Sequence, residues 1–436
     1  MTIARIDSTI LYDLPPFARQ IVEFPKVCEE ARLGEVHLFV GENGTGKTRL
    51  LSLLAAACGN PTELKARLQR PATNFVFAAD QQSTFVWGVS GNQCLGFQNG
   101  KLAQAELLDS GQIARTPAMG SRANLLGDSA SSLAMSFRGS ARISDAEIKP
   151  LSPVSFGKPE DNLLFDRQPN EDALFGQSIA NLKIRAGMYI ASRPSQSSNR
   201  NVRIADRLEK TVSNVTGRDF YFVVEESPKL QLRVTWGEKR MFLQQLPDGL
   251  RAIIGWLVAC VAKIESIHRD EENPLDLPVV LLIDEPESHL HPAWQRQVLP
   301  ALQHLLPSAQ IFVATHSPFV ISSVNHGFYY VLRADDDGVV TIDPAKPCCK
   351  GDTYLDVVQD SLGVQEWYDV ETEEELKKFR TVRDNAKHNP TDASIESMRS
   401  LATEIAERSE SLQDMMAREL AQFDRQHSAA RGNANK

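Results

Sequence analysis

The stretch Gly41-Glu42-Asn43-Gly44-Thr45-Gly46-Lys47-Thr48 has the form G-x-x-x-x-G-K-T. It follows the apolar run Val36–Val40 and precedes the helix-forming run Arg49–Ala57. A strand, a glycine loop and a helix in this order are the context that a phosphate-binding loop requires. Glycines let successive backbone N–H groups turn inward, which makes an anion-binding concavity at a helix N-terminus. The stretch therefore predicts a nucleoside-triphosphate site, with Lys47 on the β- and γ-phosphates and the Thr48 hydroxyl on Mg²⁺.

An acidic pair supplies the second half of this site. Asp284 and Glu285 directly follow the apolar run Pro278–Ile283, which has the composition of a strand that is buried on both faces. A carboxylate at this position can hold the Mg²⁺ that bridges the phosphates, and we assign this role to Asp284. Glu285 would emerge at the carboxyl end of the strand, where it can polarise a water molecule for attack on the γ-phosphate.

A histidine ends the next apolar run. His316 follows Gln310–Thr315, and the helical run Trp294–Leu306 separates this stretch from the acidic pair. We expect a βαβ unit with parallel strands and a right-handed crossover. His316 would then lie at the sheet edge where ligands bind, close to the γ-phosphate or the attacking water.

Composition sets the broad class of protein. The 436 residues carry a formal net charge of −9, with 42% hydrophobic and 24% charged residues, as in ordinary globular proteins. The acidic balance argues against a surface that binds nucleic acid as a whole, although local basic patches remain possible. The cysteines lack the spacing that is typical of zinc ligands. No apolar run has the length of a membrane span, and the N-terminus lacks the apolar core of a signal peptide. We expect a cytoplasmic protein that does not span a membrane.

The pattern along the chain divides it into three parts. Residues 1–72 and 246–345 are expected to form a discontinuous nucleotide-binding core. Residues 73–245 would hold an antiparallel β-meander, a flexible segment rich in Ser and Gly, and an insert. Residues 346–436 are predicted to be helical, with disorder from Ala429 onward.

Three local patterns leave alternatives open. Arg193, Arg200, Arg203 and Arg207 form a loose basic cluster, for which a solvated helix face is favoured over a phosphate- or nucleic-acid-binding patch. The aspartates before Gly338 favour a hairpin turn over a metal site. In the tail, apolar residues recur three, four or seven apart, which predicts one long amphipathic helix that packs on its own core or on a partner. They are Ile395, Met398, Leu401, Ile405, Leu412, Met416, Leu420 and Phe423.

These motifs together resemble a known family. The phosphate loop, the segment Leu282-Ile283-Asp284-Glu285-Pro286-Glu287-Ser288-His289-Leu290-His291-Pro292 and the segment Ala314-Thr315-His316-Ser317-Pro318 look like those of the ABC-type ATPases of the RecF, SMC and OLD branch. Within the branch, the chain is similar to the stand-alone PtuA-type ATPases of Septu and retron anti-phage systems. This closer similarity rests on the short strand-rich insert and on the acidic helical tail after Leu362-Gly363-Val364.

The resemblance implies a fold, cofactors and a set of nucleotide contacts. The fold is an α/β ABC-ATPase head, with a mixed or parallel phosphate-loop sheet and an antiparallel β-subdomain, plus a helical insert and a helical C-terminal region. The cofactors are ATP and Mg²⁺, bound between two head-to-tail protomers. The residues expected at the nucleotide are Gly41, Glu42, Asn43, Gly44, Thr45, Gly46, Lys47, Thr48 and Arg49, and, from the signature position of the opposite protomer, Asp248, Gly249 and Arg251.

Some positions depart from the family pattern. Pro247 stands where the family usually has a serine that contacts the opposite γ-phosphate, so hydrolysis is expected to be slow, although Arg251 can supply compensating charge. The switch glutamine is open among Gln81, Gln82 and Gln196. The resemblance places His289 and His291 in the dimer-contact loop, and this interpretation is favoured over a zinc site.

The resemblance also implies a role. We expect a homodimer or a higher oligomer that acts as an ATP-driven switch. Its expected partners are an HNH-type nuclease or another effector from the same operon, and DNA or a retron ribonucleoprotein. The alternative is a RecF-like ATPase that binds DNA directly in repair. A transporter subunit is disfavoured by the D-E-P-E-S-H-L-H-P form. The segment after Pro318 lacks the pattern of a metal-dependent nuclease domain, so no nuclease activity is expected in this chain.

Overall fold

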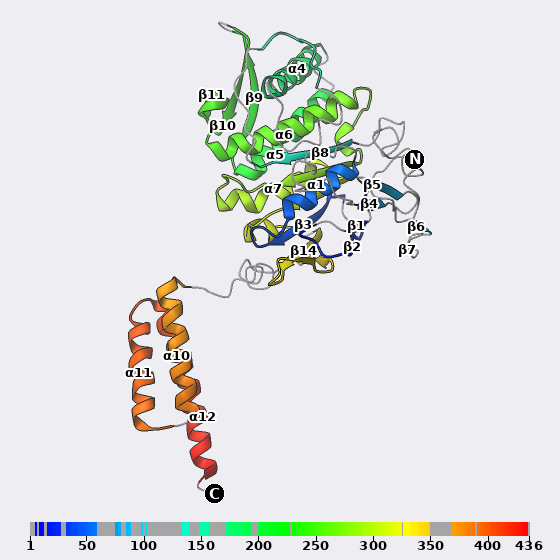
Figure 1. Cartoon of the computed structure of the whole chain (residues 1–436). Coiled ribbons are helices and arrows are strands. Elements are labelled where there is room, and N and C mark those ends of the chain that lie inside the picture. Colours follow the sequence, from blue (N-terminus) through cyan, green and yellow to red (C-terminus); the bar gives the residue numbers. More distant parts are fainter. Residues whose placement is uncertain are drawn as a thin grey trace. The chain divides into compact units, whose positions relative to one another are not determined.

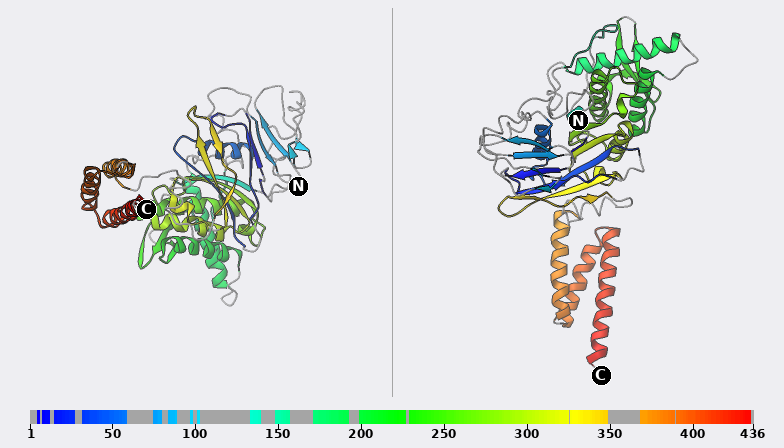
Figure 2. Two further views of the ribbon diagram at one scale, coloured as in Figure 1. Left: turned by 90° about the horizontal axis from the view of Figure 1, so that it is seen from below. Right: turned by 90° about the vertical axis from the view of Figure 1, so that its right-hand side faces the viewer.

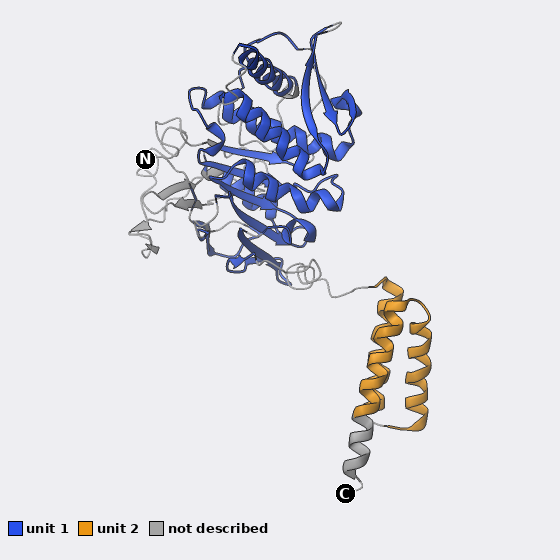
Figure 3. Ribbon diagram, turned by 180° about the vertical axis from the view of Figure 1, so that it is seen from behind, with its two compact units in different colours: residues 1–362 blue, residues 363–436 orange. Residues whose placement is uncertain are grey.

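The computed structural model of the chain describes residues 5–6, 8–12, 15–27, 32–58, 75–79, 84–88, 97–98, 101–102, 133–139, 148–156, 171–192, 199–226, 229–324, 326–348, 368–388 and 390–434. The chain divides into two compact units, residues 1–362 and residues 363–436 (Figure 3). No helix in these ranges combines the length and the apolar character that crossing a bilayer demands.

A seven-stranded sheet forms the centre of the first unit (Figure 1). Its strands lie in the order β15-β14-β3-β13-β12-β8, and β16 pairs with β14. They are β3 (Glu35–Gly41), β8 (Leu133–Arg138), β12 (Val279–Asp284), β13 (Ala309–Ala314), β14 (Gly327–Ala334), β15 (Val340–Ile342) and β16 (Lys346–Pro347). The strands from β14 to β8 are parallel to one another, and β15 and β16 are antiparallel. The predicted mixed, mainly parallel sheet is confirmed.

Both faces of this sheet are buried along its central strands β3, β12 and β13. Along β12, Val279, Leu281 and Ile283 belong to one apolar cluster, whereas Val280 and Leu282 belong to another. Side chains alternate across a strand, so a strand covered on both faces must be apolar throughout. The helix α1 lies on one face, and the helices α5, α6 and α7 lie on the other (Figure 2). The bounds of the helices beside the site are α1 (Lys47–Ala57), α6 (Asp248–Ile267), α7 (Pro292–Leu305) and α8 (Pro318–Ile321).

A second sheet is antiparallel, with the strand order β2-β1-β4-β5. Its strands are β1 (Ser8–Tyr12), β2 (Gln20–Glu23), β4 (Phe75–Ala79) and β5 (Thr84–Gly88), while β6 (Phe97–Gln98) and β7 (Lys101–Leu102) pair separately. Two antiparallel pairs, β4–β5 and β6–β7, form in the predicted meander region, but they belong to separate sheets, and the N-terminal strand β1 pairs with β4.

A lobe of helices and strands lies on the face of the central sheet that α6 covers. It contains α4 (Glu171–Ser192), α5 (Arg200–Thr216), β9 (Phe220–Glu225), β10 (Gln231–Trp236) and β11 (Lys239–Phe242). The sequence pattern predicted neither β8 nor α4. Both elements lie within residues 73–245, where a flexible segment rich in Ser and Gly was predicted, and that prediction does not hold for the residues of β8 and α4. Their apolar residues, such as Phe175, Ile179 and Leu182 on α4, are buried although the surrounding composition resembles a loop.

The basic cluster on α5 is neutralised. Each of its arginines faces a carboxylate of the segment 265–276: the pairs are Arg200–Glu265 at 3.0 Å, Arg203–Glu272 at 2.8 Å and Arg207–Asp276 at 2.6 Å. This is the solvated, ion-paired helix face that the sequence favoured. Arg193 lies outside the described residues.

The aspartates before Gly338 belong to a turn between β14 and β15. Gly338 has a φ of 77°, and the Asp335 carboxylate accepts hydrogen bonds from the N–H groups of Asp337 and Val339 at 3.1 and 2.8 Å. The favoured hairpin interpretation is therefore confirmed.

The described residues of the second unit form the helices α10 (Val370–His388), α11 (Asp392–Ala406) and α12 (Glu410–Ala434). The prediction of one long helix is wrong, because the chain breaks at residues 407–409 and Ser409 caps α12 by accepting the N–H of Leu412 at 3.2 Å. Residues of the apolar stripe, among them Met398, Met416 and Phe423, form the core of this unit. The stripe packs on its own core, and α12 continues past the point where disorder is predicted.

Candidate functional site

The phosphate loop lies between β3 and α1, as the motif predicts. Gly44 and Gly46 have φ values of 85° and 89°, which only glycine adopts without strain. Gly46 is also confined by its neighbours, because a Cβ atom there would lie 2.9 Å from the Phe17 ring. Arg49, the next predicted contact, donates a hydrogen bond to the carbonyl of Pro15. The N-terminal segment around residues 15–17 therefore packs on the loop and fixes its shape.

Lys47 is a buried cation at the start of α1. Its Nζ donates to the carbonyls of Gly41 at 2.8 Å and Glu42 at 2.7 Å. Burial lowers the pKa of this ammonium to about 8, and the charges of Asp284 and Glu285 act in the opposite direction. The group is thus poorly solvated and lies close to the acidic residues after β12.

Thr48 and Asp284 lie side by side. The Thr48 hydroxyl donates to Asp284 Oδ1 at 3.0 Å, and so joins α1 to the end of β12. A hydroxyl and a carboxylate are hard oxygen ligands, and Mg²⁺ in nucleotide sites takes few protein ligands in addition to phosphate oxygens and water. No group of three or more potential metal ligands occurs in the part of the chain that the structure describes. These two residues fit a Mg²⁺ ion that a nucleotide brings with it, and they do not fit a metal site made of protein alone.

Glu285 begins the loop after β12 in an unusual conformation. Its φ is 52°, its side chain is exposed, and its N–H donates to the Ala314 carbonyl at 2.9 Å. The Glu285 carbonyl lies against Gly139 at the end of β8, where a Cβ atom would come within 1.8 Å of the carbonyl oxygen. Only glycine fits at this position, so β8 sets the backbone from which the carboxylate projects.

His316 reaches the same place from the end of β13. Burial and the charge of Lys47 lower the pKa of its imidazole, whereas Glu285 and a hydrogen bond to the Gly41 backbone raise the pKa. The imidazole is therefore neutral at neutral pH and lies beside three other predicted site residues. Three separate segments of the chain converge here: the phosphate loop, the end of β12 and the end of β13.

The signature segment lies at the start of α6. Arg251 Nη1 is 3.5 Å from Asp248 Oδ1, and Pro247 offers the helix no side-chain cap. A Cβ atom on Gly249 would be 2.5 Å from the carbonyl of His289, so this glycine packs against the loop after β12. The signature residues thus adjoin the loop that carries Glu285.

Other predicted residues fall outside the site or outside the described part of the chain. His291 Nδ1 accepts the N–H of Ala293 at 3.2 Å and caps α7, which is a structural role. His289 has a φ of 65° in the same loop. The candidate switch glutamines, at positions 81, 82 and 196, all lie outside the described residues.

Sequence reasoning missed Glu287. It lies two residues after Glu285 in the quoted D-E-P-E segment, and its carboxylate accepts hydrogen bonds from the turn that carries His316. The available signal was a third acidic residue so close to a strand end.

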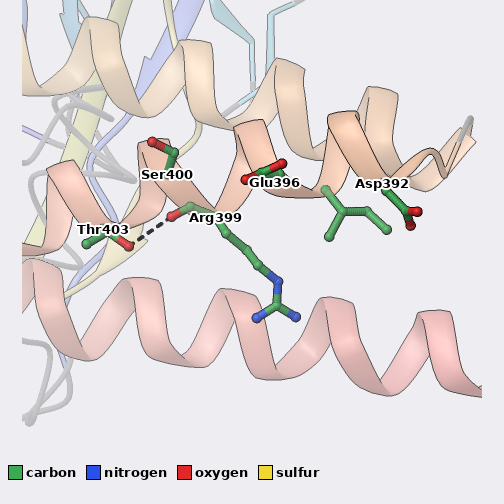
Figure 4. A pocket seen from close by; sticks show the side chains of 6 residues that line it. Asp392, Glu396, Arg399, Ser400 and Thr403 are labelled. Carbon is green, nitrogen blue, oxygen red and sulfur yellow. Dashed lines mark hydrogen bonds between the residues drawn. The ribbon is translucent and has the colours of Figure 1, made fainter.

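A surface pocket lies on the second unit (Figure 4). It is lined by Asp392, Ile395, Glu396, Arg399, Ser400 and Thr403. The guanidinium group of Arg399 forms an ion pair with Asp424, with 2.7 Å between Nη2 and Oδ1.

Comparisons with known proteins agree with the motifs. A family model described as "AAA domain, putative AbiEii toxin, Type IV TA system" matches residues 201–322. Over 104 residues the chain is 30% identical to the "Retron Ec83 probable ATPase" of Escherichia coli, covering 24% of this chain and 19% of that protein. Over 146 residues it is 25% identical to the "Septu protein PtuA" of Bacillus thuringiensis, covering 32% and 37% respectively. The SMC head domain from Thermotoga maritima is 12% identical, with a TM-score of 0.38, over 78% of this chain and 99% of that one.

The chain spans only 19% and 37% of the length of these two curated relatives. The retron and Septu matches are independent of the geometry described above, and they point to the same branch as the phosphate loop and the D-E-P-E segment. The resemblance predicted from the sequence is therefore confirmed: the chain is similar to the ABC-type ATPases of the RecF, SMC and OLD branch, and within it to the ATPases of retron and Septu systems.

Proposed function

We propose that this protein binds and hydrolyses ATP and acts as a dimeric, nucleotide-dependent switch on a partner nuclease or other effector in anti-phage defence. The observation that carries the proposal is the convergence of Lys47, Thr48, Asp284, Glu285 and His316 at one edge of the central sheet. They come from separate segments and supply a phosphate-binding cation, two metal ligands, a carboxylate base and a neutral imidazole.

Each side chain has a defined task in this proposal. Lys47 leaves its carbonyl partners to bind the β- and γ-phosphates, and the N–H groups of the loop hold the remaining phosphate oxygens. Glu285 orients a water molecule and accepts its proton. The neutral imidazole of His316 has one N–H, and it would exchange the hydrogen bond to the Gly41 backbone for one to the γ-phosphate. Thr48 and Asp284 would hold Mg²⁺, which when bound supplies positive charge to the phosphate oxygens.

The dimer follows from the place of the signature segment. Asp248, Gly249 and Arg251 lie at the N-terminus of a 20-residue helix, where the helix dipole favours an anion. In the proposed dimer they meet the γ-phosphate that is bound by the partner protomer. Pro247 cannot provide the hydroxyl expected there, so we propose slow hydrolysis and a long-lived ATP-bound dimer.

The RecF-like alternative receives no support from the basic cluster. Arg200, Arg203 and Arg207 all face carboxylates, so phosphate binding there would first have to break three ion pairs.

The partner proposal is tested in the native operon. The tagged protein, expressed with its neighbouring genes, should retain the product of at least one of them on an affinity column. ATP should change the amount retained, because the dimer and the separated heads present different surfaces. The nucleotide-free and ATP-containing columns are compared by mass spectrometry. A protein that retains no neighbouring gene product under either condition contradicts the proposed role.

The affinity for ATP should depend on pH through Lys47. With the pKa near 8 in the nucleotide-free protein, this amine is largely neutral above that pH. Bound phosphates favour the charged ammonium and raise its pKa, so binding takes up a proton at high pH. The Kd should rise by up to about tenfold per pH unit above pH 8. Calorimetric titrations from about pH 7.5 to about pH 9.5, in buffers of different ionisation enthalpy, measure both effects. A Kd that is constant over this range contradicts the assignment.

A further inference from the structure

The Glu287 carboxylate joins the two loops that carry the proposed base and the proposed imidazole. Its Oε1 atom accepts three hydrogen bonds: from Thr315 Oγ1 at 2.6 Å, from the His316 N–H at 2.9 Å and from the Ser317 N–H at 3.2 Å. The donors are consecutive residues of the turn after β13. Glu287 itself belongs to the loop after β12, so a single oxygen atom fixes one loop against the other.

A second set of hydrogen bonds closes this connection. The Ser317 hydroxyl donates to Gln295 Oε1 at 2.6 Å, and Gln295 Nε2 donates to the Leu290 carbonyl at 3.0 Å. Gln295 lies on α7, directly after the loop that contains Glu287 and Leu290. The turn after β13 is thus held by Glu287 from the loop and by Gln295 from the helix that follows the loop.

One oxygen atom of the Glu287 carboxyl group is buried without a hydrogen bond. Its Oε2 atom is inaccessible to solvent and has no hydrogen-bond partner among the residues that the structure describes. Burial, together with the neighbouring charge of Glu285, raises the pKa of this carboxyl group. A carboxylate in this position is unfavourable for stability on its own. The carboxyl group instead contributes through Oε1, which accepts hydrogen bonds from three donors at once.

We propose that Glu287 is a positioning residue for His316: its Oε1 atom holds the backbone of residues 315–317 so that the imidazole stays beside Lys47 and Glu285. This inference rests on the proposed function for its effect on hydrolysis, but the geometric effect does not depend on ATP. The role is one of geometry. A proton donor or a metal ligand at this position would instead require the charge or the acidity of the carboxyl group.

Three substitutions separate the geometric role from a charge role. Glu287→Gln keeps the length of the side chain and its acceptor oxygen, and loses the charge. Glu287→Asp keeps the charge and shortens the side chain by one methylene group, so it cannot reach all three donors. Glu287→Ala removes the acceptor. We expect kcat for ATP hydrolysis to stay near the wild-type value in Glu287→Gln and to fall on the order of 100-fold in the other two variants, because the reacting groups are misplaced.

The KM for ATP should change little in all three variants, because the phosphate loop is untouched. An active Glu287→Asp together with an inactive Glu287→Gln overturns the proposal, since that order of activities requires the charge.

A second measurement, by NMR, reports on the surroundings of the His316 imidazole and does not require ATP hydrolysis. The protein has nine histidines, and ¹³C labelling at Cε1 of the imidazole gives one NMR signal for each histidine. The signal that disappears in His316→Gln identifies the residue. In nucleotide-free Glu287→Ala and Glu287→Asp, this signal should shift and titrate closer to an ordinary histidine, because the imidazole leaves its buried place. In Glu287→Gln it should match the wild type. A His316 signal that is unchanged in Glu287→Ala overturns the inference, even if the wild-type protein hydrolyses no ATP, a result that by itself would refute only the proposed function.

Glu209 provides the matched control. It is a buried carboxylate that accepts hydrogen bonds from Lys183 Nζ at 2.7 Å and from the Phe222 N–H at 2.8 Å, in the lobe of α5 and β9. Burial raises its pKa as it does that of Glu287. Glu209→Ala should lower the thermal stability and leave both kcat and the His316 signal unchanged. If Glu209→Ala lowers kcat as much as Glu287→Ala does, the effect is general destabilisation and the proposal fails.

Discussion

Replacement of Lys47 with alanine is expected to abolish ATP binding. The ammonium group is the buried cation of the phosphate loop, held 2.7 to 2.8 Å from two of the loop's own carbonyls and ready to exchange them for phosphate oxygens. A hydrogen bond to a charged group contributes about 1.5 to 3 kcal/mol, and this cation makes more than one with the β- and γ-phosphates. The Kd for ATP should therefore rise by at least about 100-fold.

The measurement is the shift in Tm that ATP produces. A ligand that binds the folded state raises Tm in proportion to the logarithm of its concentration over Kd, so the shift should vanish in Lys47→Ala. Without nucleotide, the variant should unfold near the wild-type temperature, because the ammonium is poorly solvated. Lys263→Ala is the control: it removes another buried lysine, one that lies over the rings of Phe137 and Phe175, and it should keep the ATP-dependent shift. A normal shift in Lys47→Ala refutes the site.

Glu285→Gln should bind ATP and remain trapped as a dimer. The amide keeps the shape of the exposed side chain but cannot accept a proton from water, so kcat should fall by about 10² to 10⁴. With hydrolysis blocked, ATP continues to join the two protomers. The molar mass from light scattering should double when ATP and Mg²⁺ are added, and it should not return to the monomer value with time.

Glu238→Gln serves as the comparison for this variant. Glu238 is an exposed residue in the turn between β10 and β11, and the same change there should leave both hydrolysis and the mass in ATP as in the wild type. A monomer mass for Glu285→Gln in saturating ATP would refute the composite dimer, whereas an undiminished kcat would refute the role of Glu285 as the base.

The parts of this site that the sequence predicted share one property. Lys47, Asp284 and His316 each adjoin an apolar run of strand length, so the strand ends could be located and the parallel arrangement placed them at one edge. β8 was missed because its residues follow a long Ser-rich segment, and its partner β12 is far away in the chain. The break at Ser409 was missed because no Gly or Pro marks it. For β8 the deciding contact is not local, whereas the Ser409 cap is local and lies only three residues from Leu412.

Glu287 and Gly139 show the same limit within the site. The sequence gives no reason to join position 287 to positions 315–317, because the connection exists only when β12 and β13 are neighbours. Gly139 is constrained by the carbonyl of Glu285, which comes from a segment more than a hundred residues away. Motifs identify the groups that react, whereas the groups that hold them in place depend on the folded sheet.

The position of β3 in the central sheet has a consequence for biosynthesis. Its two neighbours, β13 and β14, both lie in the second half of the chain. The ribosome therefore makes the phosphate loop early, and the strand before it has no partner in the sheet until β13 emerges, roughly 15 to 50 seconds later at ordinary rates of synthesis. During that interval the motif is present but cannot hold a nucleotide, and an apolar strand has both of its edges open. A half-made chain thus cannot act as a premature switch, and it must be protected from aggregation until its last strands arrive.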